Sequence, residues 1–346
     1  MLIVENDIIV EINNWLKNQK YSKVFILIDE NTNTYCLPIL GLKKDSILIE
    51  IESGEVNKNL STCQYIWNKL LQNNADRNAL LINLGGGVIC DMGGFCASTY
   101  KRGIDFINIP TTLLAQVDAS IGSKTGIDFA NKKNMIGLFS ESKATFIDSI
   151  FLNTLPQREL LSGFAEVLKH GLIADKKYFR KAIDSYLKDS IHWNKIIDKS
   201  IQIKANIVAQ DPLENGLRKI LNFGHTIGHA LESYSLLKHK KPLLHGEAVI
   251  LGIIGELFLS KKRKLISQET LSEVVSMLKT IYTFDKLEKF DFEELINFML
   301  NDKKNDNEKI QCILLKEIGL ATYGQSFSEK EITDALLFIN QNTQNA

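Results

Sequence analysis

Short apolar runs alternate with helical patterns in the first half of the chain. Five runs rich in aliphatic and β-branched residues occupy residues 23–29, 46–51, 79–85, 105–110 and 144–148. Because consecutive positions in these runs are apolar, both faces of each strand would be buried, as in a parallel sheet that is covered by helices on both sides. The pattern predicts an α/β domain.

The second half has a different pattern, in which apolar residues recur every three or four positions. This period predicts amphipathic helices. They cover residues 157–188, 191–210, 217–236, 244–262, 267–280, 291–300 and 328–340. Pro156 is the clearest boundary mark, and a length of 346 residues also favours two domains. We expect an α/β domain over residues 1–155 and an all-α domain over residues 156–346.

Composition excludes several classes of function. Lysine plus arginine and aspartate plus glutamate each number 41, so no net charge attracts nucleic acid or an anionic membrane. The five cysteines contain no CxxC pair and are odd in number, which suits a reducing compartment. The first twelve residues do not resemble a signal or transit peptide, and the longest apolar run contains Glu256 and is too short for a bilayer. We expect a cytoplasmic protein.

Three glycines, Gly85 to Gly87, follow a buried strand and precede a helix. Such a turn lets backbone N–H groups approach a phosphate at the positive end of the helix. The pattern is not GxGxxG, and the acid Asp29 precedes the glycines, whereas in the dinucleotide-binding motif the acid follows them. From spacing alone, dinucleotide binding is no better supported than a plain tight turn whose helix packs closely through Gly93 and Gly94.

The predicted helix over residues 217–236 has an unusual polar face. Its apolar face consists of Ile220, Phe223, Ile227 and Leu231. Its polar face consists of Arg218, Asn222, His225, His229 and Glu232. Groups that bind metals or anions suggest the wall of a site, whereas the alternative is an exposed face with incidental histidines. Gly224 and Gly228 each cost up to ~1 kcal/mol inside a helix, which disfavours that alternative unless something must approach closely.

Neighbouring segments add further candidate metal ligands. Glu166, Lys169 and His170 lie within about one and a half helical turns, and His245 stands at the start of the next helix. A catalytic zinc site takes three protein ligands, and spacing does not choose among the four histidines and the glutamate. For His170 alone a surface position is the better interpretation, and a salt bridge is an alternative for Glu166.

Basic residues stand at loop and helix boundaries instead of in long runs, and two of them, Lys303 and Lys304, form a pair. They are Arg102, Lys124, Lys133, Lys204, Arg218, Lys303 and Lys304. Each one alone would be a solvated charge. If several converge, they would bind a compact polyanion such as a sugar phosphate acid.

Taken in order, these motifs resemble the 3-dehydroquinate synthases of the sugar phosphate cyclase group. The matching segments are SGEVNK, GGGVICDMGGF, YKRGIDFINIPTTLLAQVDASIGSKTGID, NKKNMIGLF, FLNTLPQREL, GFAEVLKHG, LRKILNFGHTIGHALE, HGEAV and NDKKND. The resemblance implies an enzyme that converts 3-deoxy-D-arabino-heptulosonate 7-phosphate (DAHP) into 3-dehydroquinate with NAD and a divalent metal, zinc or cobalt. Its steps are hydride transfer to NAD, elimination of phosphate, return of the hydride, ring opening and aldol closure.

The resemblance also implies roles for individual residues. The metal ligands would be Glu166, His225 and His245. NAD would contact Asp29, Glu55, Lys58, Gly86, Gly87, Val88, Asp91, Thr111, Thr112, Lys124, Lys133, Phe151, Leu152, Asn153 and Thr154. The substrate would contact Asp118, Lys124, Asn134, Lys169, Lys204, Arg218, Asn222, His229, Lys303 and Lys304. Arg102 would reach across a homodimer interface.

The chain departs from the family pattern at three positions. Cys90 and Ser123 stand where glycine is usual, and Pro212 where an acid is common. A positive φ at Cys90 or Ser123 would alter the loop, so we expect changed cofactor affinity with activity retained.

The alternatives are a cyclase like 2-deoxy-scyllo-inosose synthase, a polyol dehydrogenase like glycerol dehydrogenase, and a noncatalytic protein of the same fold. Lys169, Lys204 and Arg218 favour the first interpretation, because the substrates of those two enzymes lack a carboxylate.

Overall fold

The computed structural model describes residues 2–4, 8–41, 46–130, 132–284, 291–300 and 309–343. The chain divides into two compact units. One comprises Met1–Leu160 and Trp193–Ile201, and the other comprises Leu161–His192 and Gln202–Ala346. Among the residues described, none of the helices has both the length and the apolar composition needed to cross a bilayer.

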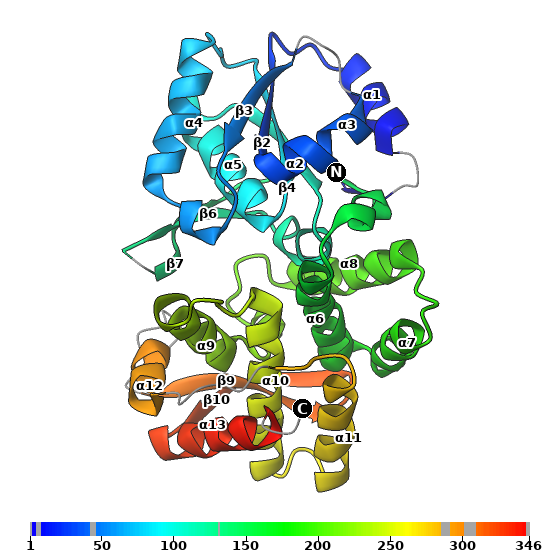
Figure 1. Ribbon diagram of the computed structural model, residues 1–346, viewed down its shortest axis with the longest axis vertical. Helices are drawn as coiled ribbons and strands as arrows, with labels where there is room; N and C mark the ends of the chain where they lie inside the picture. The colour runs from blue at the N-terminus through cyan, green and yellow to red at the C-terminus, as the bar shows by residue number, and fades with distance from the viewer. Residues whose placement is uncertain are drawn as a thin grey trace. The chain divides into compact units, whose positions relative to one another are not determined.

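The first unit contains a six-stranded parallel sheet in the order β1-β8-β5-β4-β2-β3. Figure 1 labels β2, β3 and β4 of this sheet. Its strands are β1 (Leu2–Val4), β2 (Val24–Asp29), β3 (Ile47–Ile51), β4 (Leu80–Gly85), β5 (Asp105–Pro110) and β8 (Ala144–Ile147). The five predicted strands are confirmed to within about one residue at each end. Strand β1 was not predicted, since three residues carry no periodic signal.

Helices cover both faces of this sheet, as the apolar strands predicted. The helices are α1 (Ile8–Lys17), α2 (Glu30–Tyr35), α3 (Leu37–Leu40), α4 (Leu60–Gln72) and α5 (Gly87–Thr99). In β2, Phe25 and Leu27 pack in the core beneath α4 and α5, whereas Ile26 and Ile28 pack in the core beneath α1 and α3. A separate antiparallel hairpin, β6 (Lys124–Phe129) with β7 (Lys132–Phe139), was not predicted.

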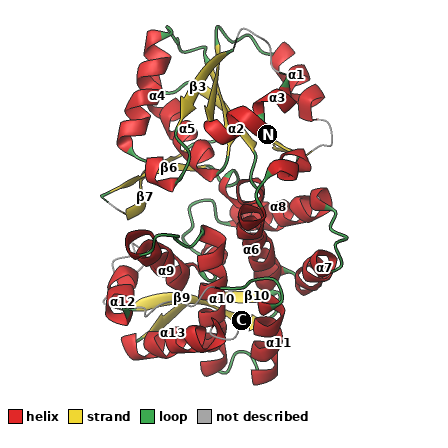
Figure 2. Cartoon of the chain, viewed as in Figure 1, coloured by secondary structure: helices red, strands yellow, loops and turns green. Residues whose placement is uncertain are grey.

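The second unit is mainly helical (Figure 2). Its helices are α6 (Gln157–Ala174), α7 (Lys176–Leu187), α8 (Trp193–Gln210), α9 (His225–Lys238), α10 (His245–Lys262), α11 (Gln268–Lys279), α12 (Phe292–Leu300) and α13 (Glu329–Thr343), of which α6 and α8 begin in the first unit. The fold class is confirmed with one correction, because the second half is not all-α. An antiparallel hairpin, β9 (Ile310–Glu317) with β10 (Leu320–Phe327), turns at Gly319, whose φ is +97°.

Two predicted helices are broken in the structure. The stretch 157–188 forms α6 and α7, because the carboxylate of Asp175 accepts a hydrogen bond from the Tyr178 amide and starts a new helix. The stretch 217–236 forms a short 3₁₀ helix, Leu217–Asn222, followed by α9. Gly224 separates them with a left-handed φ of 80°. The polar stripe therefore does not run along one continuous helix.

Candidate active site

Three glycines determine how α9 meets α10. A Cβ atom on Gly224 would lie 2.8 Å from the Val249 carbonyl oxygen, and one on Gly228 would lie 2.9 Å from the Ala248 carbonyl oxygen. From the other side, a Cβ atom on Gly252 would lie 1.9 Å from the Gly224 carbonyl oxygen. The close approach suggested by Gly224 and Gly228 is thus confirmed, and the partner is helix α10.

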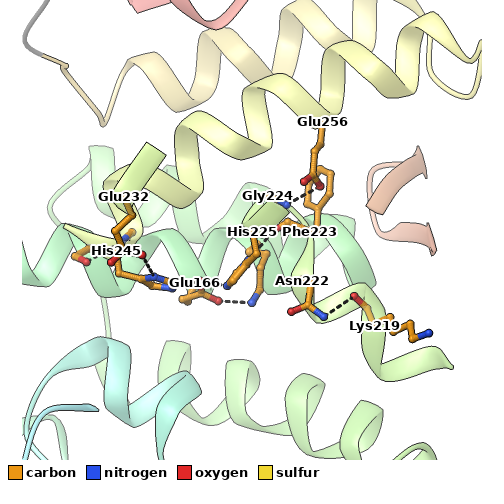
Figure 3. Close-up of polar contacts among 12 residues, drawn as sticks. Glu166, Lys219, Asn222, Phe223, Gly224, His225, Glu232, His245 and Glu256 are labelled. Atoms are coloured by element: carbon orange, nitrogen blue, oxygen red, sulfur yellow. Dashed lines mark hydrogen bonds and ion pairs between the residues drawn. The ribbon is translucent and has the colours of Figure 1, made fainter. Parts of the chain in front are cut away.

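Helix α9 begins directly at His225, after a turn that buried groups stabilise. The Gly224 amide donates to Glu256 Oε2 at 2.8 Å, and Glu256 is fully buried on α10. The Nδ1 atom of His225 lies 3.1 Å from the Phe223 carbonyl oxygen (Figure 3). This contact anchors one side of the imidazole, so that Nε2 points away from the turn.

Two imidazoles converge on one carboxylate oxygen. Nε2 of His225 lies 3.5 Å from Glu166 Oε1, and Nε2 of His245 lies 3.6 Å from the same oxygen (Figure 3). These separations exceed ordinary N–H···O hydrogen bonds. They are close to the roughly 3.3 Å that separates two ligands of a tetrahedral zinc ion whose bonds measure about 2.0–2.1 Å. The three residues fit a divalent metal ion.

Lys169 occupies the other side of the same carboxylate. Its ammonium group forms an ion pair with Glu166 Oε2, and both side chains are buried. The salt bridge considered for Glu166 is therefore present together with the metal-type geometry. A buried carboxylate needs compensating partners, and here they are an ammonium group at one oxygen and two imidazoles at the other.

His229 lies beside the two histidines of this group. The ring nitrogens of His225, His229 and His245 lie within 4.8 Å of one another. Geometry alone therefore admits His229 as a further ligand or as a neighbour of the bound substrate. His170 is fully buried on α6, so the expectation of a surface histidine is wrong.

The charges around His245 favour a cation. Burial lowers the pKa of His245, but the carboxylates of Glu232 and Glu166 outweigh burial and raise this pKa to about 10. In the metal-free protein the imidazole therefore keeps a proton, which occupies the position that suits a metal ion.

Three of the predicted substrate-binding cations are buried in the second unit. Lys169, Lys204 and Arg218 are each at most 6% exposed, which excludes the interpretation of solvated surface charges. The Arg218 side chain donates to the Pro212 carbonyl oxygen at 2.5 Å, and its backbone amide donates to Asp211 Oδ2 at 3.0 Å.

Asn222 is the last residue of the 3₁₀ helix Leu217–Asn222, which also contains Arg218. Its side-chain amide nitrogen donates to Glu214 Oε1 at 2.5 Å. Two further predicted substrate residues, Lys303 and Lys304, lie outside the described residues.

The predicted NAD-binding residues of the first unit gather at one edge of its sheet. Asp29 ends β2, Gly86 follows β4, Thr111 follows β5, and the segment Ser149–Thr154 follows β8. Because the strands are parallel, all these positions lie at their carboxyl ends. The chain order reverses between β2 and β4, and this is where open α/β sheets bind nucleotides.

The glycine turn has both properties that the sequence suggested. Gly86 is the residue before α5 and has no side chain to cap the first-turn amides, which suits an anionic group there. A Cβ atom on Gly93 would lie 2.0 Å from Asn83 Oδ1, and one on Gly94 would lie 2.6 Å from Thr125 Cγ2. Close packing is therefore confirmed, and phosphate binding is compatible with it.

Polar contacts join several of the predicted cofactor-binding residues. Lys58 Nζ contacts Asp91 Oδ2 and Asn134 Oδ1, each at 2.7 Å, and Lys133 pairs with Glu55 at 3.1 Å. Burial lowers the pKa of Lys58, but Asp91 and Glu55 outweigh it and raise the pKa. Asn134, predicted to contact substrate, thus belongs to this group in the structure.

The predicted residues of the first unit differ in side-chain contacts and in exposure. Asp29 caps α2 by accepting from the Thr32 amide at 2.8 Å, and Phe151 is buried in the core, which leaves its main chain for a ligand. Asp118 is partly buried, whereas Lys124 and Arg102 are exposed.

Cys90 and Ser123, which stand where the family pattern has glycine, differ in backbone conformation. Cys90 lies inside α5, where glycine has no conformational advantage, whereas Ser123 has a φ of +59°. A positive φ is therefore needed only at Ser123.

Sequence reasoning missed Glu256 and Glu214 as parts of the site. The available signal for Glu256 was a single acid in the longest apolar run of the chain. Buried acids need partners, and for Glu256 one of them is the Gly224 backbone amide.

Comparison with known families decides the relationship. The N-terminal model of the 3-dehydroquinate synthases matches residues 48–162, and the C-terminal model matches residues 163–305. The chain belongs to the 3-dehydroquinate synthase family. A 3-dehydroquinate synthase of Parabacteroides distasonis is 42% identical over 98% of each chain. One of Pelagibacter ubique is 39% identical over 96% of this chain and 93% of the relative.

Solved structures show the same fold. A 2-epi-5-epi-valiolone synthase from Streptomyces hygroscopicus, with NAD⁺ and Zn²⁺ bound, has a TM-score of 0.88 and 25% identity over 99% of this chain and 96% of its own. A 2-deoxy-scyllo-inosose synthase with carbaglucose-6-phosphate, NAD⁺ and Co²⁺ has a TM-score of 0.86 and 22% identity over 97% and 95% of the two chains. A glycerol dehydrogenase from Schizosaccharomyces pombe is less similar, with a TM-score of 0.67 and 15% identity over 99% and 89%.

Proposed function

We propose that this protein is a 3-dehydroquinate synthase that converts DAHP into 3-dehydroquinate and phosphate. The observation that carries the proposal is the convergence of His225 and His245 on Glu166, with Lys169 on the other carboxylate oxygen. This arrangement occurs in a chain that is 42% identical to a relative named for that activity.

Glu166, His225 and His245 would hold the metal ion, which is zinc or cobalt. NAD would bind at the carboxyl edge of the parallel sheet, with its pyrophosphate at the turn of Gly86 and Gly87. When bound, NAD accepts and returns a hydride, and the metal ion stabilises negative charge on substrate oxygens.

The chain's own residues would bind and orient the anionic substrate. Lys169, Lys204 and Arg218 are buried cations, and contacts to Glu166 and to the Pro212 carbonyl oxygen hold Lys169 and Arg218 in place to bind a carboxylate. Asp211 holds the Arg218 backbone and keeps its own pKa below the ordinary value, because amide hydrogen bonds to its carboxylate outweigh burial. His229, next to the metal ligands, would contact the phosphate region.

A turnover assay tests this function. Metal-loaded protein is incubated with DAHP and NAD, and the release of phosphate and the formation of product are followed. The proposal predicts both, without net reduction of NAD. Processing of glucose 6-phosphate in place of DAHP would favour a 2-deoxy-scyllo-inosose synthase, and net NADH formation from glycerol would favour a polyol dehydrogenase.

The two histidines of α9 separate metal binding from substrate binding. His225→Ala is expected to abolish metal retention along with activity. His229→Ala is expected to lose turnover while retaining most of the metal, which elemental analysis measures. Equal metal loss in both variants would contradict the assignment of His229 to substrate.

We also propose a cofactor domain over residues 1–155 and a metal- and substrate-binding domain over residues 156–346. The resemblance supports a homodimer with Arg102 at its interface. The five free, buried cysteines support a cytoplasmic location. Sedimentation with and without Arg102→Glu would test the dimer, because a buried charge reversal at the interface should shift the protein toward monomer.

A further inference from the structure

Glu232 lies on the same helix as a proposed metal ligand but contacts a different one. It follows His225 by seven residues on α9, which places both side chains on one face two turns apart. Its Oε2 atom lies 3.3 Å from Nδ1 of His245, the first residue of α10 (Figure 3). Helix α9 thus carries one proposed ligand, His225, and a side chain that contacts another, His245.

The contact fixes which nitrogen of His245 faces Glu166. With Nδ1 beside Glu232, the opposite nitrogen Nε2 lies 3.6 Å from Glu166 Oε1. A neutral imidazole that donates its Nδ1 hydrogen to a carboxylate has its lone pair on Nε2, and a lone pair is what a metal ion requires. His225 has the equivalent arrangement, with a backbone carbonyl oxygen in place of the carboxylate.

His245 depends on such a contact more than His225 does. It stands directly after the loop that joins α9 to α10, and its side chain is 23% exposed, against 9% for His225. Glu232 is only 3% exposed, and its carboxylate is therefore held in place by its surroundings. A rigid acceptor beside a more exposed ring restricts the rotation of that ring.

We propose that Glu232 is a positioning residue that orients His245 and fixes its tautomer for metal binding. The proposal rests on the metal centre of the proposed function. Removal of a hydrogen-bond partner of a metal ligand typically weakens metal affinity about 10- to 100-fold.

The experiment measures Co²⁺ affinity by competition with a chelator, together with the visible absorption spectrum of the Co²⁺-loaded protein. Glu232→Ala and Glu232→Leu both remove the acceptor, and leucine fills the space that alanine would leave empty. Both are expected to weaken Co²⁺ binding about 10- to 100-fold and to change the spectrum. Glu232→Gln retains an oxygen that can accept from Nδ1 and should recover most of the affinity.

A matched control removes a charge elsewhere around α9. Glu294→Gln disrupts a partly exposed ion pair with Lys238 at the last residue of that helix and should leave both readouts unchanged. A folded Glu232→Leu protein with wild-type affinity and spectrum would overturn the proposal, as would a Gln variant that binds as weakly as the Leu variant. Failure of the wild-type protein to bind Co²⁺ at all would instead refute the metal centre of the proposed function.

Discussion

Gly252 is the position where the contact between α9 and α10 leaves least space, and Gly252→Ala tests whether that contact builds the metal centre. The added Cβ atom would lie 1.9 Å from the carbonyl oxygen of Gly224 and 2.7 Å from the amide nitrogen of Gly228. Both neighbours are backbone atoms of the segment that carries His225, so no side-chain rotation can relieve the overlap.

The size of the effect follows from these distances. An ordinary contact begins at 3.4 Å, so the two backbones must separate locally by about 1.5 Å. Overpacking of this kind costs about 1–3 kcal/mol, and the better helix propensity of alanine returns up to ~1 kcal/mol. We expect the free energy of unfolding to fall by about 1–2 kcal/mol. Because metal ligands tolerate displacements of only about 0.2 Å, metal affinity should fall at least roughly tenfold.

Urea denaturation and chelator competition measure these two quantities. Gly255→Ala, one turn along α10, is the matched control, since its Cβ atom would meet only the ends of the Ile227 and Ile339 side chains, at 2.8 and 2.9 Å. These ends can rotate away, so stability should change by less than about 1 kcal/mol. A Gly252→Ala protein with wild-type stability and metal affinity would refute the argument that this contact positions the ligands.

Three further predictions concern the backbone, the cofactor and pH. Ser123→Gly should stabilise the protein by roughly 0.5–1 kcal/mol in urea denaturation, because the left-handed φ of +59° favours glycine, whereas Cys90→Gly inside α5 should destabilise it by at least about 1 kcal/mol. Gly86→Ala should raise the Kd for NAD about tenfold in a calorimetric titration, since its Cβ atom would lie 3.1 Å from Thr112 where the pyrophosphate is proposed to bind. Burial lowers the pKa of His245, but the neighbouring carboxylates raise it to about 10, so metal uptake at pH 8 should release about one proton, measurable by calorimetry in buffers of different ionisation enthalpy. The stabilisation from this raised pKa is complete below about pH 6.5, so the urea midpoint of the metal-free protein should fall as pH rises from 6.5 toward 10.

The sequence predicted the elements whose pattern is local. Strands that are apolar on both faces, such as β2 and β4, and helices with a 3.6-residue period, such as α10 and α11, lie within about two residues of their predicted bounds. The hairpin of β6 and β7 was missed because its second strand is largely exposed and alternates weakly. The hairpin of β9 and β10 was missed although Gly319 marked its turn.

The residue types of the site were predictable, but their grouping was not. Periodicity placed His225 and Glu232 on one face, and the structure keeps them there. The spacing of Glu166 and Lys169 allowed their ion pair, but nothing in it showed that His225 and His245 would meet the other oxygen of Glu166, because α9 and α10 lie far from α6 in the sequence. The family resemblance, not the periodicity, selected these ligands.

The break at Gly224 shows why local pattern was insufficient. Polar residues spaced by four, three, four and three satisfy a continuous helix from Arg218 to Glu232, and one glycine costs such a helix only about 1 kcal/mol. The buried carboxylate of Glu256 changes this balance, because it would lack the Gly224 amide as a donor if the helix continued and that amide bonded to its own helix. Loss of a hydrogen-bond donor from a buried carboxylate costs about 1–3 kcal/mol, which adds to the cost of Gly224 in a continuous helix. A residue 32 positions away thus determines where α9 starts, and with it the orientation of His225 toward Glu166.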